Sequence, residues 1–247
     1  MQQGIHIADY SYLLHNKALF HVRNAQLMKG QLIVLLGVNG SGKTTLIRAI
    51  PGIQKEGKGV IAVEGKAMQA YTSLEMAKLV SVQFTGRQGI PGAFEVKSLI
   101  ATGRYPHSGS FGFGTEKDDQ MVMDSAKWMG ITDLLAREVD TLSDGEFQKV
   151  MLARALAQDT PYILLDEPFS FLDYPAKLDL MLKLKELAKS GKGILFSSHE
   201  LDLVLPHATE VWIFCKNREG GSDVKSFNIH APELKAHLHS EFGFEGW

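Results

Sequence analysis

Nine consecutive residues combine glycines, a lysine and two threonines in a spacing that suits phosphate binding. They are Gly37, Val38, Asn39, Gly40, Ser41, Gly42, Lys43, Thr44 and Thr45. Glycine lacks a Cβ, so this backbone can curl and point successive N–H groups at an anion. The Lys43 ammonium can bind the β- and γ-phosphates of a nucleotide, and the Thr44 hydroxyl can ligate magnesium. These residues therefore predict a loop that binds a nucleoside triphosphate together with Mg²⁺.

The segments on either side of this loop have the patterns that a phosphate-binding loop requires. Residues 32–36 are all apolar and predict a strand buried on both faces. The apolar pattern of residues 46–50 predicts a helix that ends at Pro51. The start of that helix adds positive partial charge where phosphates would lie. A chance glycine-rich turn is the alternative, and the flanking strand and helix argue against it.

Two adjacent carboxylates follow a later apolar run and form a second candidate for chemistry. Residues 162–165 predict a buried strand, and Asp166 and Glu167 follow it directly. Such strands deliver their last residues to the ligand-binding edge of a doubly wound sheet. Asp166 would hold magnesium, directly or through water, and Glu167 could accept a proton from the attacking water. Alone, the pair could also end a strand in a turn; downstream of a phosphate loop it predicts a nucleoside triphosphatase.

The composition is that of an ordinary globular protein. The 247 residues allow one large domain or two small ones, with 45% hydrophobic and 22% charged residues. The formal net charge of -2 gives no basic field, so we expect no nucleic acid partner. The single cysteine, Cys215, lies in an apolar run, which predicts a buried thiol and fits a reducing cytoplasm.

The chain shows no sign of a membrane segment of its own. Its first residues lack the basic start and apolar stretch of a signal peptide. No apolar run approaches the ~20 residues that a membrane span needs. We therefore expect that a partner would hold this protein at any membrane where it works.

Alternating and apolar runs predict a mixed α/β fold around the two motifs. Residues 5–8 and 19–23 alternate and predict half-buried antiparallel strands. Further strands are expected over residues 59–65, 79–84, 193–198 and 211–215. Residues 85–159 are first rich in glycine and then helical in pattern, which predicts a helical insert. The tail, residues 216–247, carries no motif beyond a short helix over residues 232–239.

With these elements in place, the sequence resembles the ATPase subunits of ABC transporters over about residues 5–215. The family's motifs occur in its usual order: phosphate loop 37–45, signature 142–146, Walker B strand 162–167, D-loop 170–173 and switch histidine His199. The signature is the most specific of these, because no other phosphate-loop class carries one here. The resemblance implies a single ABC ATPase domain, with a RecA-like core over about 1–84 and 160–215, a helical subdomain over about 85–159 and a tail over about 216–247.

The resemblance also implies partners and roles for residues outside the loop. Two chains, in the simplest case two copies of this one, would pack head to tail, so that Ser143 and Gly145 of one complete the ATP site of the other. A serine hydroxyl, a glycine N–H and a helix N-terminus can each bind a γ-phosphate. Tyr12 would stack on adenine, His199 would contact the γ-phosphate, and the D-loop would bring Asp173 to the nucleotide. A membrane-embedded permease would hold the pair at the cytoplasmic face of the membrane, and a substrate-binding protein would act on it indirectly.

Three positions leave alternatives open. Asp144 replaces the first of the two glycines usual in the signature, and its carboxylate must point away from the triphosphate or cap the helix. Gln83 is the nearest glutamine to the end of its strand and the candidate magnesium ligand, but strict spacing could place Thr85 there, and Gln88 is a third option. Tyr12, taken alone, could be a packed tyrosine rather than an adenine contact.

Residues 103–107 narrow the family further. This run, from Gly103 to His107, resembles the importer ATPases for iron-siderophore, heme and cobalamin; the alternative is a surface loop without substrate information. The leading hypothesis is an ATP-hydrolysing subunit of such an importer, and an ABC ATPase for another transported substrate is the second. A soluble ABC ATPase of DNA repair or translation would need long coiled coils or a second cassette. A non-hydrolysing scaffold does not fit a chain that carries both Glu167 and His199.

Overall fold

The computed structural model describes residues 3–14, 17–87, 94–107, 114–217 and 220–244. Within them, a ten-stranded mixed sheet has the strand order β5-β4-β1-β2-β10-β9-β3-β8-β7-β6. The strands are β1 (Ile5–Leu14), β2 (Lys17–Leu27), β3 (Leu32–Leu36), β4 (Gly57–Val63), β5 (Lys66–Ala67), β6 (Val80–Gln83), β7 (Tyr162–Leu165), β8 (Gly193–Ser197), β9 (Glu210–Lys216) and β10 (Ser222–Asn228). This order places the phosphate-loop strand β3 inside the sheet, with only β8 between it and the carboxylate strand β7.

The strands β9, β3, β8, β7 and β6 run parallel, so their carboxyl ends meet at one edge of the sheet. β3, β7 and β8 are buried along their whole length, which explains why apolar residues dominate their sequences. Alternate residues of β3 enter different hydrophobic clusters. Val34 packs in the cluster that includes the helical insert, and Ile33 packs in the cluster that includes the N-terminal strands. Apolar layers on both faces therefore fix the sheet and the edge at which the site lies.

The N-terminal strands continue the sheet with antiparallel pairing, as the sequence predicts. β1 pairs with β2 on one side and β4 on the other, and its inward residues Ile5 and Ile7 are fully buried. The segment that the sequence set apart as a tail supplies β10, which pairs with β2 and β9 and buries Val224. That segment is therefore joined to the sheet, and its predicted short helix is α8 (Pro232–Phe242).

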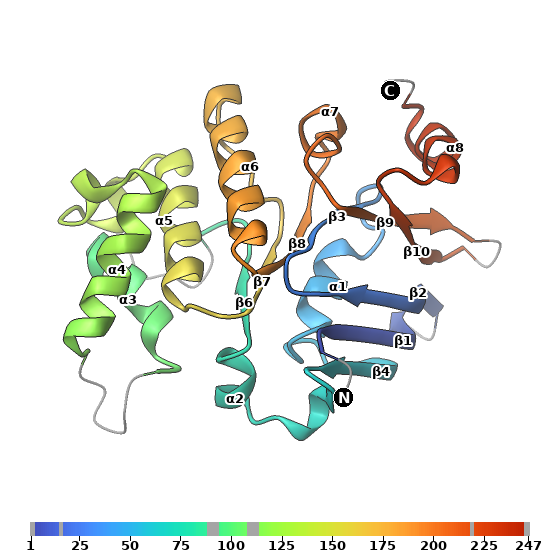
Figure 1. Cartoon of the computed structure of the whole chain (residues 1–247), viewed down its shortest axis with the longest axis horizontal. Helices are drawn as coiled ribbons and strands as arrows, with labels where there is room; N and C mark the ends of the chain where they lie inside the picture. Colours follow the sequence, from blue (N-terminus) through green and yellow to red (C-terminus); the bar gives the residue numbers. More distant parts are fainter. Residues whose placement is uncertain (1–2, 15–16, 88–93, 108–113, 218–219, 245–247) are drawn as a thin grey trace.

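One group of helices forms a lobe at one end of the sheet, and the other helices, including the longest, lie along the sheet (Figure 1). α3, α4 and α5 form the lobe, which confirms a helical insert between β6 and β7. Thr115 and Ser143 cap α4 and α5 through capping boxes. The helices are α1 (Lys43–Ala49), α2 (Ser73–Ala77), α3 (Val96–Ala101), α4 (Glu116–Met129), α5 (Asp144–Ala157), α6 (Tyr174–Lys189), α7 (Leu201–Val204) and α8, with single 3-10 turns at Met68–Ala70, Thr102–Arg104, Thr132–Leu134 and Val139–Thr141.

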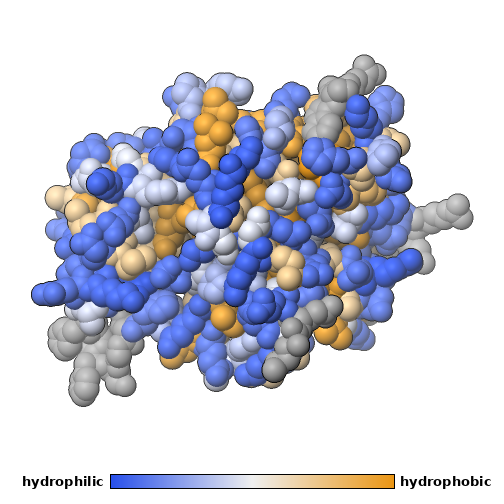
Figure 2. Space-filling view, in the orientation of Figure 1, coloured by the Kyte–Doolittle hydropathy of each residue, from blue (hydrophilic) through white to orange (hydrophobic). Residues whose placement is uncertain are grey.

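Figure 2 shows a face that is mostly hydrophilic, with hydrophobic side chains in small separate groups. None of the helices in the described part of the chain has the length and apolar character needed to cross a bilayer.

A buried ion pair holds the helical lobe together. Arg104 donates to Asp118 Oδ1 of α4 over 2.8 Å and to the Ala157 carbonyl of α5 over 2.7 Å, and the side chains of the charged pair are 5% and 9% exposed. The preceding Gly103 lies against α5, where an added Cβ would come 2.3 Å from the Arg154 carbonyl oxygen. The first two residues of the run 103–107 thus have a packing explanation, whereas Tyr105 is exposed.

We predict that Asp118→Asn lowers the free energy of unfolding by about 3 kcal/mol, because the buried Arg104 guanidinium would lose its carboxylate. The backbone N–H of Thr115 and the Arg104 guanidinium lower the pKa of Asp118 to about 2. The difference between the two proteins should therefore be full above pH 4 and vanish as the pH falls toward 2. Denaturant titrations measure it.

Asp119→Asn is the matched control. Asp119 is the next residue, and its ion pair with Lys97 is exposed, so its loss should change the free energy of unfolding by less than about 1 kcal/mol. Equal losses from both variants would contradict the assigned role of the buried pair.

Candidate nucleotide site

The loop between β3 and α1 has the geometry of a phosphate cradle. Gly42 caps α1 with a φ of 109°, and an added Cβ there would lie 2.5 Å from Phe20 Cδ1. At Gly37 an added Cβ would lie 2.5 Å from Ser41 Oγ. Ser41 Oγ is buried and has no hydrogen-bond partner among the described residues. An unsatisfied buried hydroxyl inside a ring of glycines fits a site that a polar ligand completes.

Lys43 crosses the loop instead of pointing into solvent. Its Nζ donates to the carbonyl oxygens of Gly37 over 2.7 Å and of Val38 over 3.3 Å. Burial lowers the pKa of Lys43, while the nearby carboxylates of Glu167 and Asp166 act in the opposite direction. The ammonium is thus held where phosphate oxygens could replace the two carbonyls.

Asp166 is the centre of a hydrogen-bond network at the edge of the sheet. Its Oδ2 accepts from the Thr44 hydroxyl over 2.7 Å, and its Oδ1 accepts from the Ser197 hydroxyl over 2.8 Å. The Thr85 hydroxyl donates to the Asp166 backbone carbonyl over 2.6 Å. Among the described residues, no group of three or more histidine, cysteine or carboxylate side chains could hold a metal alone. A hydroxyl beside one carboxylate is instead the arrangement that suits Mg²⁺ shared with nucleotide phosphates.

Glu167 and His199 face each other across the site. His199 Nε2 lies 3.0 Å from Glu167 Oε1, at ion-pair distance, although that oxygen accepts no hydrogen bond from the described residues. Glu167 has a φ of 49°, a backbone region that is strained for a residue with a side chain. Burial raises the pKa of Glu167 to about 7, with Lys43 opposing and Asp166 adding to the effect. Burial also lowers the pKa of His199. A carboxyl that titrates near neutrality suits a general base.

A cavity of about 410 Å³ joins these groups. It is lined by Leu19, Asn39, Gly40, Gly42, Lys43, Thr44, Thr45, Glu167, Ser170 and His199. Most of them are residues that the sequence predicts for the site. Leu19 and Ser170 had no assigned contact there: the first lies in a predicted strand and the second in the D-loop. Ser197, which orients Asp166, was also missed, although it directly precedes Ser198 and His199 in the sequence.

The structure does not bring Tyr12 or the Gln83 amide to the cavity. Tyr12 is 6% exposed, stacks on Phe20 with 5.9 Å between ring centroids, and accepts a hydrogen bond from Gln54. An adenine contact stays a prediction that would require this ring to leave its packing. Gln83 is 1% exposed, and its amide donates to the Phe84 carbonyl and to Gln148.

Of the three candidates for the magnesium-sensing residue, Thr85 lies in contact with Asp166. The geometry therefore favours Thr85 over Gln83. The third candidate, Gln88, lies outside the described residues.

The signature residues lie away from the cavity of their own chain. Ser143 caps α5 and Asp144 is its first residue, and Figure 1 shows α5 in the helical lobe, apart from α1. An added Cβ at Gly145 would come 2.8 Å from the Phe171 carbonyl of the D-loop, and Asp173 caps α6 through the Ala176 N–H. The Asp144 carboxylate pairs with Arg87 over 3.2 Å. The helix cap is Ser143, so Asp144 does not take that role.

These features define a phosphate-loop nucleoside triphosphatase fold with a helical insert. A solved nucleotide-free ATP-binding cassette from an ABC transporter has the same fold, with a TM-score of 0.80 at 20% identity over 96% of this chain and 95% of that one. The family model of ABC transporters matches residues 20–170. The chain belongs to the ABC transporter family, as an ATP-binding domain, and the resemblance drawn from its motifs is confirmed.

Named relatives support the same assignment. The achromobactin transport ATP-binding protein of Dickeya dadantii is 36% identical over 74% of this chain and 68% of its own length. The ferric enterobactin transport ATP-binding protein of Escherichia coli is 33% identical over 75% of this chain and 69% of its own length. An uncharacterized ABC transporter ATP-binding protein of Methanocaldococcus jannaschii is 37% identical over 74% of this chain, and the match spans 63% of that relative.

We predict that Glu167→Gln makes the protein more stable at high pH. In the unfolded chain this carboxyl ionises near pH 4.5, whereas in the folded protein it stays protonated up to about pH 7. As the pH rises from 4.5 to about 7, the wild type therefore loses stability relative to the variant. Outside this pH range the difference between the two proteins stays constant. At pH 8 the variant should be more stable by about 1–3 kcal/mol. Denaturant titrations at pH 4.5 and 8 check this, and a pH-independent difference would contradict it.

Proposed function

We propose that this chain is the ATP-hydrolysing subunit of an ABC importer, held by a membrane-embedded permease at the cytoplasmic face of the membrane. The observation that carries the proposal is the convergence of Lys43, Thr44, Glu167 and His199 on one cavity beside a helix N-terminus, with Asp166 hydrogen-bonded to Thr44. A phosphate-binding loop, a hydroxyl next to a carboxylate and a buried base are together the parts that phosphoryl transfer to water requires.

The groups of the site divide the tasks of this reaction among them. Lys43 and the loop N–H groups bind the β- and γ-phosphates, and the positive end of α1 adds to the attraction. Thr44 and Asp166 would hold Mg²⁺, which neutralises charge on the phosphates. Ser197 fixes the Asp166 carboxylate, and its oxygen also accepts from the Glu167 N–H over 2.8 Å. Glu167 takes the proton of the attacking water, and His199 stabilises the γ-phosphate and orients Glu167.

The site is completed by a second chain, in this proposal a second copy of the same one. Ser143 and Gly145 are remote from the phosphate loop of their own chain, yet they begin a helix and offer a hydroxyl and an N–H. A head-to-tail pair would place them opposite the γ-phosphate of the partner's nucleotide. Such an interface closes on itself with two identical sites, as a two-fold symmetric dimer requires.

The relatives supply the argument for the substrate class. Their names assign them to achromobactin and ferric enterobactin transport, and Gly103 to His107 resembles the same importers. Gly103 and Arg104 already have a packing role. The relatives are therefore a stronger argument for the substrate class than the sequence of residues 103–107. We propose import of a metal chelate, with a substrate-binding protein delivering it to the permease.

We predict that Lys43→Ala and Glu167→Gln separate binding from hydrolysis. Lys43→Ala removes the only side-chain cation of the loop, so it should weaken ATP binding at least about tenfold and abolish turnover. Glu167→Gln should keep ATP binding, lower the hydrolysis rate by about 10²–10⁴ and accumulate an ATP-bound dimer on a sizing column. Wild-type affinity in the first variant, or parental hydrolysis in the second, would contradict these roles.

The substrate class has its own test. The purified chain should show low ATPase activity, and in liposomes with its permease a binding protein loaded with ferric siderophore, heme or cobalamin should stimulate it. Stimulation only by a partner loaded with sugar or amino acid would overturn the substrate class and leave the ATPase assignment standing.

A further inference from the structure

The signature of this chain carries two carboxylates beside Ser143, at the helix start that the proposed dimer turns toward a triphosphate. Asp144 is 64% exposed and Glu146 is 34% exposed. The Glu146 carboxylate also accepts the Ser143 hydroxyl and the Ser143 N–H, each over 2.8 Å. Two unneutralised negative charges at this point would repel the γ-phosphate.

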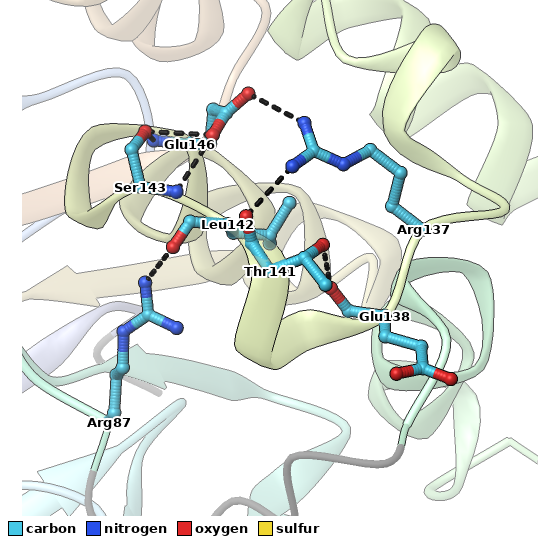
Figure 3. A network of polar contacts seen from close by, with 7 residues as sticks. All are labelled: Arg87, Arg137, Glu138, Thr141, Leu142, Ser143 and Glu146. Atoms are coloured by element: carbon cyan, nitrogen blue, oxygen red, sulfur yellow. Dashed lines mark hydrogen bonds and ion pairs between the residues drawn. The ribbon is translucent and has the colours of Figure 1, made fainter.

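Two arginines meet these two carboxylates, one each. Arg87 Nε lies 3.2 Å from Asp144 Oδ1, and Arg137 Nη1 lies 3.1 Å from Glu146 Oε1. They come from different segments, Arg87 from the chain just after β6 and Arg137 from the stretch between the 3-10 turns Thr132–Leu134 and Val139–Thr141. Figure 3 shows them approaching the turn that contains Leu142 and Ser143 from opposite sides. Together the four side chains sum to zero formal charge.

Backbone contacts fix where both guanidinium groups lie. Arg87 donates to the carbonyls of Val139 and Leu142, and its guanidinium carbon lies 4.6 Å from the centroid of the Phe147 ring. Arg137 donates to the Thr141 carbonyl over 2.7 Å. The two positive charges are therefore held at the signature by more than the carboxylates that they neutralise.

We propose that Arg87 and Arg137 are positioning residues that neutralise Asp144 and Glu146, so that the signature can accept the γ-phosphate of ATP bound to the other subunit. This inference rests on the proposed dimeric function. Exposed ion pairs contribute little to folding stability, whereas the same charges facing a polyanion across an interface decide whether the interface closes. The arginines thus act on dimer closure and leave the binding of ATP to the isolated chain unchanged.

The test uses the full chain with Glu167→Gln, in which the ATP-bound dimer accumulates. In that background, Arg87→Met or Arg137→Met should raise the dimer dissociation constant with ATP at least about tenfold, because each dimer contains the altered contact twice. The Kd for ATP of the monomer should stay unchanged. Lys97→Met is the matched control, since it removes the cation of an exposed pair with Asp119 in the same lobe, and it should dimerise like its parent.

Rescue separates charge neutralisation from simple bracing of the backbone. Removing the carboxylate should restore dimerisation, so Arg87→Met with Asp144→Asn and Arg137→Met with Glu146→Gln should both dimerise like the parent. Raised salt should narrow the defect of the single variants. Parental dimerisation by both single variants, or defects that neither paired substitution restores, would overturn the inference. If the Glu167→Gln parent itself forms no dimer with ATP, the proposed function fails instead.

Discussion

The hydrogen bond between Thr44 and Asp166 joins the two halves of the site. It links the first turn of α1 to the end of β7, two segments separated by 122 residues in the sequence. The contact depends on the parallel order β3-β8-β7. Because the three strands run in the same direction, their carboxyl ends meet at one edge of the sheet and bring Thr44 and Asp166 together. Ser197, on the strand between them, bridges Asp166 and the Glu167 backbone. The buried strands thus act as a rigid frame for a few polar contacts.

This rigid frame holds Lys43 and Glu167 in conformations and environments that cost free energy. Lys43 is buried against carbonyl oxygens, Glu167 has a positive φ and a raised pKa, and its Oε1 accepts no hydrogen bond from the residues that the structure describes. Each of these features lowers the stability of the nucleotide-free protein, and each is relieved or used when phosphates enter. The two apolar layers that cover the sheet fix the positions of these charged groups before a ligand binds.

Local patterns were enough to predict most of the elements and to single out most residues of the candidate site. Unbroken apolar runs identified β3, β7 and β8, and the loop glycines and the residues after β7 identified Lys43, Thr44, Asp166 and Glu167. The predictions fail where a contact between residues far apart in the sequence determines the structure. The strand β10 has few apolar residues and exists because β2 and β9 pair with it.

The same holds for individual side chains. The burial of Tyr12 depends on Phe20 and Gln54, and the preference for Thr85 over Gln83 depends on which side chain reaches Asp166 and which turns toward Gln148. Nothing in the local sequence around Arg87 indicates that it meets Asp144, more than fifty residues later.

In the proposed function, each ATP site combines the phosphate loop of one chain with the signature of the other. A mixture of two inactive chains tests this arrangement. Both chains carry Glu167→Gln; one also carries Lys43→Ala, and the other also carries Ser143→Arg. A mixed dimer retains one intact composite site, because the unaltered phosphate loop of the Ser143→Arg chain faces the unaltered signature of the Lys43→Ala chain. We predict that each mixed dimer traps about half as much ATP as a parent dimer, while each chain alone traps almost none. No trapped ATP in the mixture would contradict it.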